Sequence, residues 1–324
     1  MLRGEGMGTT ATRRPTVVAL GGNAFAGPDG ALSVPREREL AADVAERLEP
    51  VFKASGGVVV THGNGPQVGQ QLLRVEVAAE RAYRLPLDSC VAATQGELGD
   101  VLATALRQSL LERGDTRLVA AVLSHVVVDR HASAFQAPSR PVGPFLDEAR
   151  AKALRREGVM VGVDPAGRGL RRLVPAPEPL EILEADVIRA LLKLGAVVVA
   201  CGGGGIPVAR DGVHLLSVEA VVDKDLTAAL LADALDAALF VVITDVPSAF
   251  TDFGSPRRAA VTEVTASRLR DLLAEGHFAP GTMAPKVEAC VRFVIAPGRR
   301  AVICDSASVE EALKGEAGTQ VVFD

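Results

Sequence analysis

Three apolar segments of the chain, each typical of a buried strand, run directly into a cluster of glycines. In a parallel α/β sheet, ligands bind beyond the carboxyl ends of the strands, where glycines let backbone N–H groups approach an anion. One glycine pair after a strand is typical of a tight turn, but three clusters after three strands indicate an anion-binding edge. The clusters are Gly21, Gly22 and Asn23; Gly63, Asn64 and Gly65; and Gly202, Gly203, Gly204 and Gly205.

Two lysines stand where helices are expected to begin. Lys224 lies between Asp223 and Asp225, and Lys286 follows Pro285. A lysine at a helix N-terminus opposes the helix dipole, which favours anions there. A solvated surface lysine is the simpler interpretation of each segment alone, but the placement has a reason if both helices point at a phosphate. Asp225 is expected to be the N-cap of its helix.

Fixed positive groups and backbone donors are the parts that phosphoryl transfer needs, because its loose transition state spreads negative charge over three equatorial oxygens. An acceptor oxygen that is already anionic needs no general base, which agrees with a sequence that shows no evident His–Asp or Ser–His pairing. His62, inside a glycine cluster, has either a structural or a functional role. The histidines expected to be structural are His125, His131, His214 and His277.

Several other chemistries are disfavoured. No glycine cluster matches GxGxxG or GxxxxGK[ST], which argues against a dinucleotide-dependent oxidoreductase and a P-loop enzyme. The histidines show no metal-ligand spacing, and the net charge of −5 argues against a nucleic-acid partner. No apolar run reaches the roughly 18 residues of a membrane helix, and residues 1–15 lack the apolar core of a signal peptide. We therefore expect a cytoplasmic protein that binds neither nucleic acid nor membranes. The cysteines expected to be small buried residues are Cys90, Cys201, Cys290 and Cys304.

Strand-like and helical segments alternate along the chain, and 48% of the residues are hydrophobic. This pattern predicts an α/β fold with a sizeable core and a mainly parallel sheet. Asp211-Gly212 predicts a hairpin turn, and Ser308 and Glu311 have the spacing of a capping box. The expected strands are residues 16–20, 58–62, 118–129, 196–201, 238–246 and 300–304. The expected helices are residues 35–55, 67–84, 88–113, 181–194, 225–235, 267–275 and 285–295.

Residues 130–179 differ from the rest of the chain, because seven prolines interrupt them and they show no periodicity. A long irregular stretch inside a compact domain is usually functional. We expect it to form an inserted flap or small subdomain, with an ordinary surface excursion as the alternative.

Taken together, these motifs resemble those of the carbamate kinases, which are members of the amino acid kinase superfamily. Long stretches match in order and cover nearly the whole chain after about residue 16. They are VVALGGNA, VTHGNGPQVG, LDSCVAATQGELG, RPVGPF, GRGLRRLVPAPEP, CGGGGIPV, AVVDKDLTAALLA, EGHFAPGTMAPKVEA and GTQVV.

The resemblance implies a three-layer αβα sandwich around a mainly parallel sheet, the amino acid kinase fold, with a protruding flap subdomain over residues 130–179. It implies an acceptor-binding half, residues 16–195, and a nucleotide-binding half, residues 196–324, after a disordered tail, residues 1–15. It also implies a homodimer whose sheet continues across the interface. The implied reaction links ATP and carbamate to ADP and carbamoyl phosphate, with Mg²⁺, usually toward ATP and within arginine metabolism.

The resemblance also assigns roles to residues. Lys224 and Lys286 would neutralise the transition state, and Asp225 would orient them. Contacts to the transferred phosphoryl group would come from Gly21, Gly22 and Asn23. Groups expected to bind the acceptor and substrate are Gly63, Asn64, Gly65, Arg140, Gly203 and Gly204. Groups expected to bind the nucleotide are Lys224, Thr244, Asp245, Met283 and Lys286. Mg²⁺ would be held by the nucleotide phosphates, and no metal ligand is expected from the protein.

The chain departs from the family pattern at three places in the expected flap. Arg140 stands where the family typically carries a lysine, and Leu170 stands where it tends to carry an aromatic residue. Residues 128–132 lack the family's acidic, proline-bearing stretch. The alternatives are therefore a related kinase that phosphorylates another small acid and a nucleotide-binding regulator without turnover, although intact Lys224 and Lys286 argue against the regulator.

Overall fold

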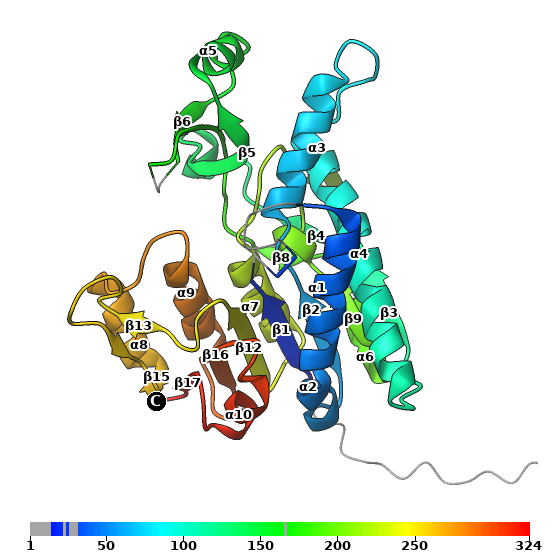
Figure 1. The fold of residues 1–324 in the computed structure, drawn as a ribbon, viewed down its shortest axis with the longest axis vertical. Coiled ribbons are helices and arrows are strands. Elements are labelled where there is room, and N and C mark those ends of the chain that lie inside the picture. The colour runs from blue at the N-terminus through cyan, green and yellow to red at the C-terminus, as the bar shows by residue number, and fades with distance from the viewer. Residues whose placement is uncertain (1–13, 22–23, 26–31, 165–166) are drawn as a thin grey trace, which may run out of the picture.

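The computed structural model describes residues 14–21, 24–25, 32–164 and 167–324. Helices cover both faces of an eight-stranded sheet, which confirms the predicted three-layer α/β architecture (Figure 1). Neighbouring strands in this sheet are parallel except for β16 and β17. In spatial order the strands are β15 (Glu263–Thr265), β17 (Thr319–Val322), β16 (Arg300–Asp305), β12 (Leu239–Thr244), β1 (Thr16–Leu20), β2 (Val58–Thr61), β9 (Val197–Ala200) and β3 (Val119–Val122).

The middle strands are apolar because both of their faces are covered. Every residue of β1, β2 and β9 is buried, as expected of central parallel strands. Because side chains alternate across a strand, Val17 and Ala19 join one apolar core and Val18 and Leu20 join the other.

Two groups of helices supply the outer layers. One core lies under α6 (Ala185–Lys193), α7 (Lys224–Ala234), α8 (Ala266–Ala274) and α9 (Met283–Phe293). The other core lies under α1 (Val34–Arg47), α2 (Glu49–Ala54), α4 (Leu87–Glu112) and α10 (Val309–Lys314). The carboxyl ends of β1, β2, β9 and β12 thus open between two helix layers, at the edge where the glycine clusters stand.

A second, four-stranded sheet corrects two of the predicted elements. Residues 118–129 do not form one strand: β3 ends at Val122 and β4 begins in the other sheet, because the buried Ser124 between them donates from its hydroxyl to Val122 O (2.9 Å) and turns the chain. The helix predicted from residue 181 starts at Ala185, because residues 181–182 pair with β4. The predicted hairpin at Asp211-Gly212 is confirmed. In spatial order the strands are β11 (His214–Ser217), β10 (Ile206–Asp211), β4 (His125–Val127) and β8 (Glu181–Ile182).

The middle of residues 130–179, here called the flap, projects from the main body around β5, α5 and β6 (Figure 1), whereas Phe135 and Pro175 near its two ends contact the main body. The expectation of an irregular segment was wrong, because most of the flap is regular. Pro141 and Pro144 lie in β5, an edge strand, where the missing N–H groups are tolerated. The flap's elements are the single-turn 3₁₀ helix η1 (Ser133–Phe135), β5 (Arg140–Leu146), α5 (Glu148–Arg156), β6 (Val161–Val163) and β7 (Leu170–Val174), with the strands in the order β5-β7-β6.

The flap contacts the main body at α3 (Gly65–Val77). Glu76 of α3 forms ion pairs with two arginines of the flap: Arg150 Nη2 lies 3.1 Å from Glu76 Oε2, and Arg172 Nη2 lies 3.0 Å from Glu76 Oε1. Gly69 of α3 faces Gly143 of β5 so closely that a β-carbon on Gly69 would lie 3.2 Å from the Gly143 Cα. An apolar cluster that includes residues of α3, β5 and β7 fills the rest of this contact.

Smaller corrections concern element ends. The first predicted helix is divided at Leu48 into α1 and α2, with a proline in the first turn of α2. The helix predicted for residues 67–84 ends at Val77. Ser308 is the N-cap residue of α10, but the predicted capping box is absent, because its hydroxyl donates instead to Asp305 Oδ1 (2.6 Å). The hairpin β13 (Phe250–Thr251) and β14 (Ala259–Ala260) was not predicted.

The predicted tail falls mostly outside the described residues. Its last two residues are anchored: Arg14 pairs with Asp236 (2.7 Å), and Ala238 N donates to Pro15 O (3.0 Å). The four cysteines are free and buried, as expected. Among the described helices, none combines the length and the apolar character that crossing a bilayer requires.

The glycine contact between α3 and the flap can be tested with a matched pair of helical glycines. Replacing Gly by Ala in a helix interior usually stabilises by roughly 1 kcal/mol. Gly96 of α4 has open space around its Cα, so Gly96→Ala should show this gain. Gly69→Ala should instead lower the free energy of unfolding by about 1 kcal/mol, because its methyl group presses on the β5 backbone. Urea unfolding of both variants measures the difference, and an equal gain at both positions would contradict the tight contact.

Candidate active site

One buried carboxylate joins two lysines from different helices. Lys224 is the first residue of α7, and Lys286 lies in the first turn of α9. Lys224 Nζ donates to Asp225 Oδ1 at 2.7 Å, and Lys286 Nζ donates to Asp225 Oδ2 at 2.9 Å. The structure therefore brings together all three residues, and both lysines stand at helix N-termini as predicted.

The cap of α7 corrects the sequence prediction. Asp223, not Asp225, is the N-cap residue: its Oδ1 accepts from the amides of Asp225 (2.9 Å) and Leu226 (3.3 Å). The sequence analysis assigned both the helix cap and the contacts with the lysines to Asp225. In the structure Asp223 is the cap, and Asp225 contacts the lysines. Asp223 satisfies the helix amides, which leaves both oxygens of Asp225 free to accept from the lysines.

Burial and charge act in opposite directions on this cluster. Burial alone would raise the pKa of Asp225, but the charges and hydrogen bonds of Lys224 and Lys286 outweigh it and hold that pKa below its ordinary value. Burial lowers the pKa of Lys224, a shift that Asp225 opposes and Lys286 reinforces. Two ammonium groups and one carboxylate leave a surplus positive charge in a largely dehydrated place, where an anion is strongly favoured.

The second and third glycine clusters interlock. A β-carbon on Gly202 would lie 2.4 Å from His62 Nε2, and one on Gly203 would lie 2.0 Å from Asn64 Nδ2. Only glycine therefore fits where these two strand ends meet. The first cluster is also packed closely, because a β-carbon on Gly21 would lie 3.1 Å from Ile243 O at the end of β12.

Three amides of the third cluster donate to acceptors within the protein. The amides of Gly203, Gly204 and Gly205 donate to His62 O (2.7 Å), Cys201 O (3.1 Å) and Gly202 O (3.2 Å), respectively. These N–H groups are used within the protein rather than presented to an anion. The third cluster includes the single 3₁₀ turn η2 (Gly202–Gly204). Its role is steric: because its residues have no side chains, the end of β9 can pack against the second cluster.

The second cluster leaves a helix N-terminus open. Asn64 occupies the N-cap position of α3 but does not cap it, because its Nδ2 donates to Thr94 Oγ1 (2.8 Å) of α4. The amide of Gly65 donates to no acceptor among the described residues. An uncapped N-terminus carries free N–H groups and positive potential, which suit an anion. This part of the predicted anion-binding edge therefore has backbone donors available to an anion.

Buried polar residues that the sequence analysis missed hold these loops in place. Gln95 of α4 donates through Nε2 to Gly202 O (3.1 Å) and Ser124 O (3.1 Å) and accepts from Ser124 N (2.9 Å). Thr227 of α7 donates to Gly204 O (3.0 Å). Thr94 and Gln95 lie on the buried side of a helix that was predicted correctly, so polar residues on its apolar face were the available signal.

The flap reaches this cluster through Arg140, the first residue of β5. Its Nη2 donates to Asp223 Oδ2 at 2.8 Å. Arg140 therefore lies beside the N-cap of α7, and its partner Asp223 precedes Lys224 in the chain. The predicted contact of Arg140 with the acceptor stays a prediction.

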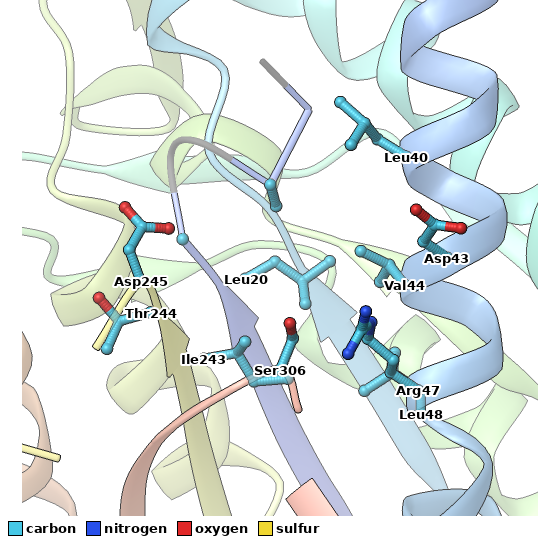
Figure 2. Close-up of a pocket in the computed structure, with 12 residues that line it drawn as sticks. Leu20, Leu40, Asp43, Val44, Arg47, Leu48, Ile243, Thr244, Asp245 and Ser306 are labelled. Carbon is cyan, nitrogen blue, oxygen red and sulfur yellow. The ribbon is translucent and has the colours of Figure 1, made fainter. Parts of the chain in front are cut away.

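The residues expected to bind the nucleotide are divided. Met283 is the first residue of α9, one turn before Lys286. Thr244 and Asp245 lie at the end of β12 and line a cavity of about 230 Å³ that also borders Gly21. Figure 2 shows side chains of α1, such as Arg47, on one side of this cavity and Thr244 and Asp245 on the other.

Two of the residues predicted to contact the phosphoryl group, Gly22 and Asn23, lie outside the described residues. Within the described part of the chain, no three Asp, Glu, His or Cys side chains gather as a metal site would require.

His62 is fully enclosed between the glycine clusters. Its Nδ1 lies 3.1 Å from Gly63 O, and its ring packs edge-on against Phe25. Burial lowers the pKa of His62 to about 4, and the nearby charge of Lys224 acts in the same direction, while the contact with Gly63 opposes it. The imidazole is therefore neutral at pH 7 and supports the loops by packing.

The buried neutral His62 predicts a pH-dependent stability. The unfolded chain binds a proton near the ordinary pKa of 6.5, but the native protein does so only near 4. The contribution of His62 to the free energy of unfolding should therefore be fully present above pH 6.5. The free energy of unfolding should fall by about 3 kcal/mol as the pH is lowered toward 4.

Urea unfolding of the parent protein and of His62→Gln between pH 4.5 and 7.5 measures this effect. The variant should lose this part of the pH dependence, whatever its absolute stability. His214→Gln on the exposed strand β11 is the matched control and should keep the parent's slope. Equal slopes in all three proteins would refute the assignment.

Comparison with known proteins agrees with this geometry. The sequence profile of the amino acid kinase family matches residues 14–305. A carbamate kinase of Thermococcus kodakarensis is 42% identical over 94% of this chain and 98% of its own length. Carbamate kinase 1 of Enterococcus faecium is 43% identical over 89% of this chain and 92% of its own length. A carbamate kinase of Giardia lamblia, solved with AMP-PNP bound, superposes with a TM-score of 0.90 at 35% identity, covering 96% of this chain and 99% of its own. The chain belongs to the amino acid kinase family.

Proposed function

We propose that the protein is a carbamate kinase, a phosphotransferase that catalyses ATP + carbamate = ADP + carbamoyl phosphate. The observation that carries the proposal is the Lys224–Asp225–Lys286 cluster beside the interlocked glycine loops, in a chain that resembles carbamate kinases over nearly its whole length. This arrangement offers fixed positive charge at helix N-termini, which phosphoryl transfer requires.

The residues would divide the reaction as follows. The ammonium groups of Lys224 and Lys286 would neutralise charge on the equatorial oxygens of the phosphoryl group in transit, and Asp225 would fix their positions. The open N-terminus of α3 and the end of β1 at Gly21 would face the same group. Carbamate is already an anion, so its oxygen can attack phosphorus without a general base. The neutral, enclosed His62 is in keeping with that chemistry.

The two halves of the chain would hold the two substrates. We propose that the acceptor lies between α3 and the flap, and that the nucleotide lies over β12 and α9 near Thr244, Asp245 and Met283. Mg²⁺ would enter with the nucleotide phosphates and supply positive charge to them. The family resemblance further favours operation toward ATP, in the cytoplasm.

An active enzyme is favoured over a nucleotide-binding regulator. A protein that had lost turnover would have no need to keep two lysines buried on one carboxylate, an arrangement that costs desolvation energy. A related kinase with a different small acid as acceptor would share the same cluster, so the choice of acceptor has to be tested directly.

The direct test is ATP formation from ADP, Mg²⁺ and carbamoyl phosphate in a coupled assay. The parent should turn over, and Lys224→Ala or Lys286→Ala should each lower the rate on the order of 10²–10³-fold, as loss of one transition-state donor commonly does. The double variant sets the background, and a parent rate no higher than that background would sink the proposal.

The exposed Lys53 of α2 provides a matched control for the loss of a lysine. Lys53→Ala should keep the parent rate. Thermal unfolding of each variant separates lost chemistry from lost structure, because removal of one buried lysine leaves Asp225 with a single partner. A loss below tenfold in both single variants would place the lysines outside the reaction.

We propose that the protein is a homodimer whose main sheet continues through β3. This strand lies at the edge of the sheet, so one side of its backbone has no neighbouring strand in the described chain. Leu118 and Leu123 at its two ends are 64% and 54% exposed. An exposed edge with large apolar side chains is a pairing surface, and natural monomers usually protect such edges.

Charge at this edge should therefore dissociate the dimer. Sedimentation velocity should report a dimer for the parent and a monomer for Leu118→Lys/Leu123→Lys, because two lysines per copy would face their symmetry mates across the interface. Val213→Lys, at an exposed hairpin tip on the other sheet, is the control and should remain dimeric. A parent that sediments as a monomer would refute the assembly.

A further inference from the structure

The carboxylate of Asp223 makes two kinds of contact with its two oxygens. Oδ1 accepts from the first amides of α7, at 2.9 Å from Asp225 N and 3.3 Å from Leu226 N. Oδ2 accepts from Arg140 Nη2 of the flap at 2.8 Å. One side chain thus fixes both the helix that carries Lys224 and the flap's arginine.

Among the described residues, the guanidinium group of Arg140 has one hydrogen-bond partner, Asp223. Neither its Nε nor its Nη1 donates to any acceptor among the described residues, and its side chain is 35% exposed. Its neighbours in the flap are engaged differently: Arg172 pairs with Glu76, and Arg171 donates to Gly143 O and pairs with Asp164. Because a guanidinium is planar and rigid, fixing Nη2 also fixes the direction of the remaining donors.

We propose that Asp223 is a positioning residue for the acceptor: it orients Arg140 so that the free edge of the guanidinium binds an anionic group of carbamoyl phosphate. This inference rests on the proposed function and extends it to a residue that touches no substrate. It also gives a reason for arginine at this position. A lysine ammonium has no fixed plane, so pairing with Asp223 would not set the direction of its remaining donors.

The proposal can be tested by removing the charge of Asp223, because the effect on acceptor binding should differ between proteins with and without Arg140. The charged groups that face this carboxylate are Arg140 and Lys224, together with the amides of α7. While Arg140 is present, loss of the Asp223 charge should weaken acceptor binding, because the guanidinium loses its orientation. Once Arg140 is removed, Asp223 is only a negative charge near an anion site, so its loss should leave acceptor binding unchanged or improve it.

The experiment is a double-mutant cycle with the parent, Asp223→Asn, Arg140→Ala and the double variant. Asparagine is as good an N-cap as aspartate, so α7 remains capped. We expect Asp223→Asn to lower kcat/KM for carbamoyl phosphate about tenfold in the parent and not at all in Arg140→Ala, with KM for ADP within about twofold throughout. Asp211→Asn, which breaks a different ion pair between the flap and the main body, the pair with Arg130, is the control and should match the parent.

Three outcomes would overturn the proposal. Equal losses in both backgrounds would mean that Asp223 acts only on the helix, and a gain in both would mean that it competes with substrate for Arg140. A kcat/KM of Asp223→Asn equal to that of the parent would mean that the Asp223–Arg140 pair has no role in acceptor binding. Calorimetric titration of inorganic phosphate into the same four proteins repeats the cycle without turnover, so a parent that binds phosphate but makes no ATP would fail the proposed function alone.

Discussion

The site depends on one buried ionic contact, the carboxylate of Asp225 shared by Lys224 and Lys286. Two ammonium groups from two helices repel each other, and each also loses hydration on burial. A single carboxylate between them lowers both costs and still leaves one positive charge unmatched. Because Asp223 caps α7, each oxygen of Asp225 accepts from one lysine.

A second constraint is steric and comes from the backbone. The ends of β2 and β9 approach so closely that His62 and Asn64 fill the space where side chains on Gly202 and Gly203 would stand. This contact uses the amide of Gly203, and the N-terminus of α3 is left uncapped, because the side chain of Asn64 bonds to Thr94 instead. Of these two loops, the second therefore offers an open helix N-terminus to an anion.

The sequence predicted what depends on short-range pattern and failed where the outcome depends on distant partners. Apolar runs located β1, β2, β9, β12 and β16 within two residues at each end, and both predicted lysines lie at helix N-termini beside Asp225. The choice between Asp223 and Asp225 as cap could not be made, because the deciding partner, Lys286, lies 61 residues away. The same is true of the Gly203 amide, whose acceptor is His62 O in the loop after β2. Residues 118–129 looked like one strand because periodicity does not show that a chain passes between two sheets.

The charge balance of the site suggests why the flap must take part. Near the head of α7, the cations Lys224, Lys286 and Arg140 face the carboxylates of Asp225 and Asp223, a net charge of only +1. The phosphoryl group in transit, its acceptor and the nucleotide phosphates together carry more negative charge than this. Helix N-termini supply part of the difference, and Mg²⁺ arriving with the nucleotide would supply more. Arg140 is one of the three cations in this balance, so the flap contributes part of the fixed positive charge near α7. A kinase built in this way would hold its acceptor weakly until the flap's arginine is in place, and Asp223 determines where that place is.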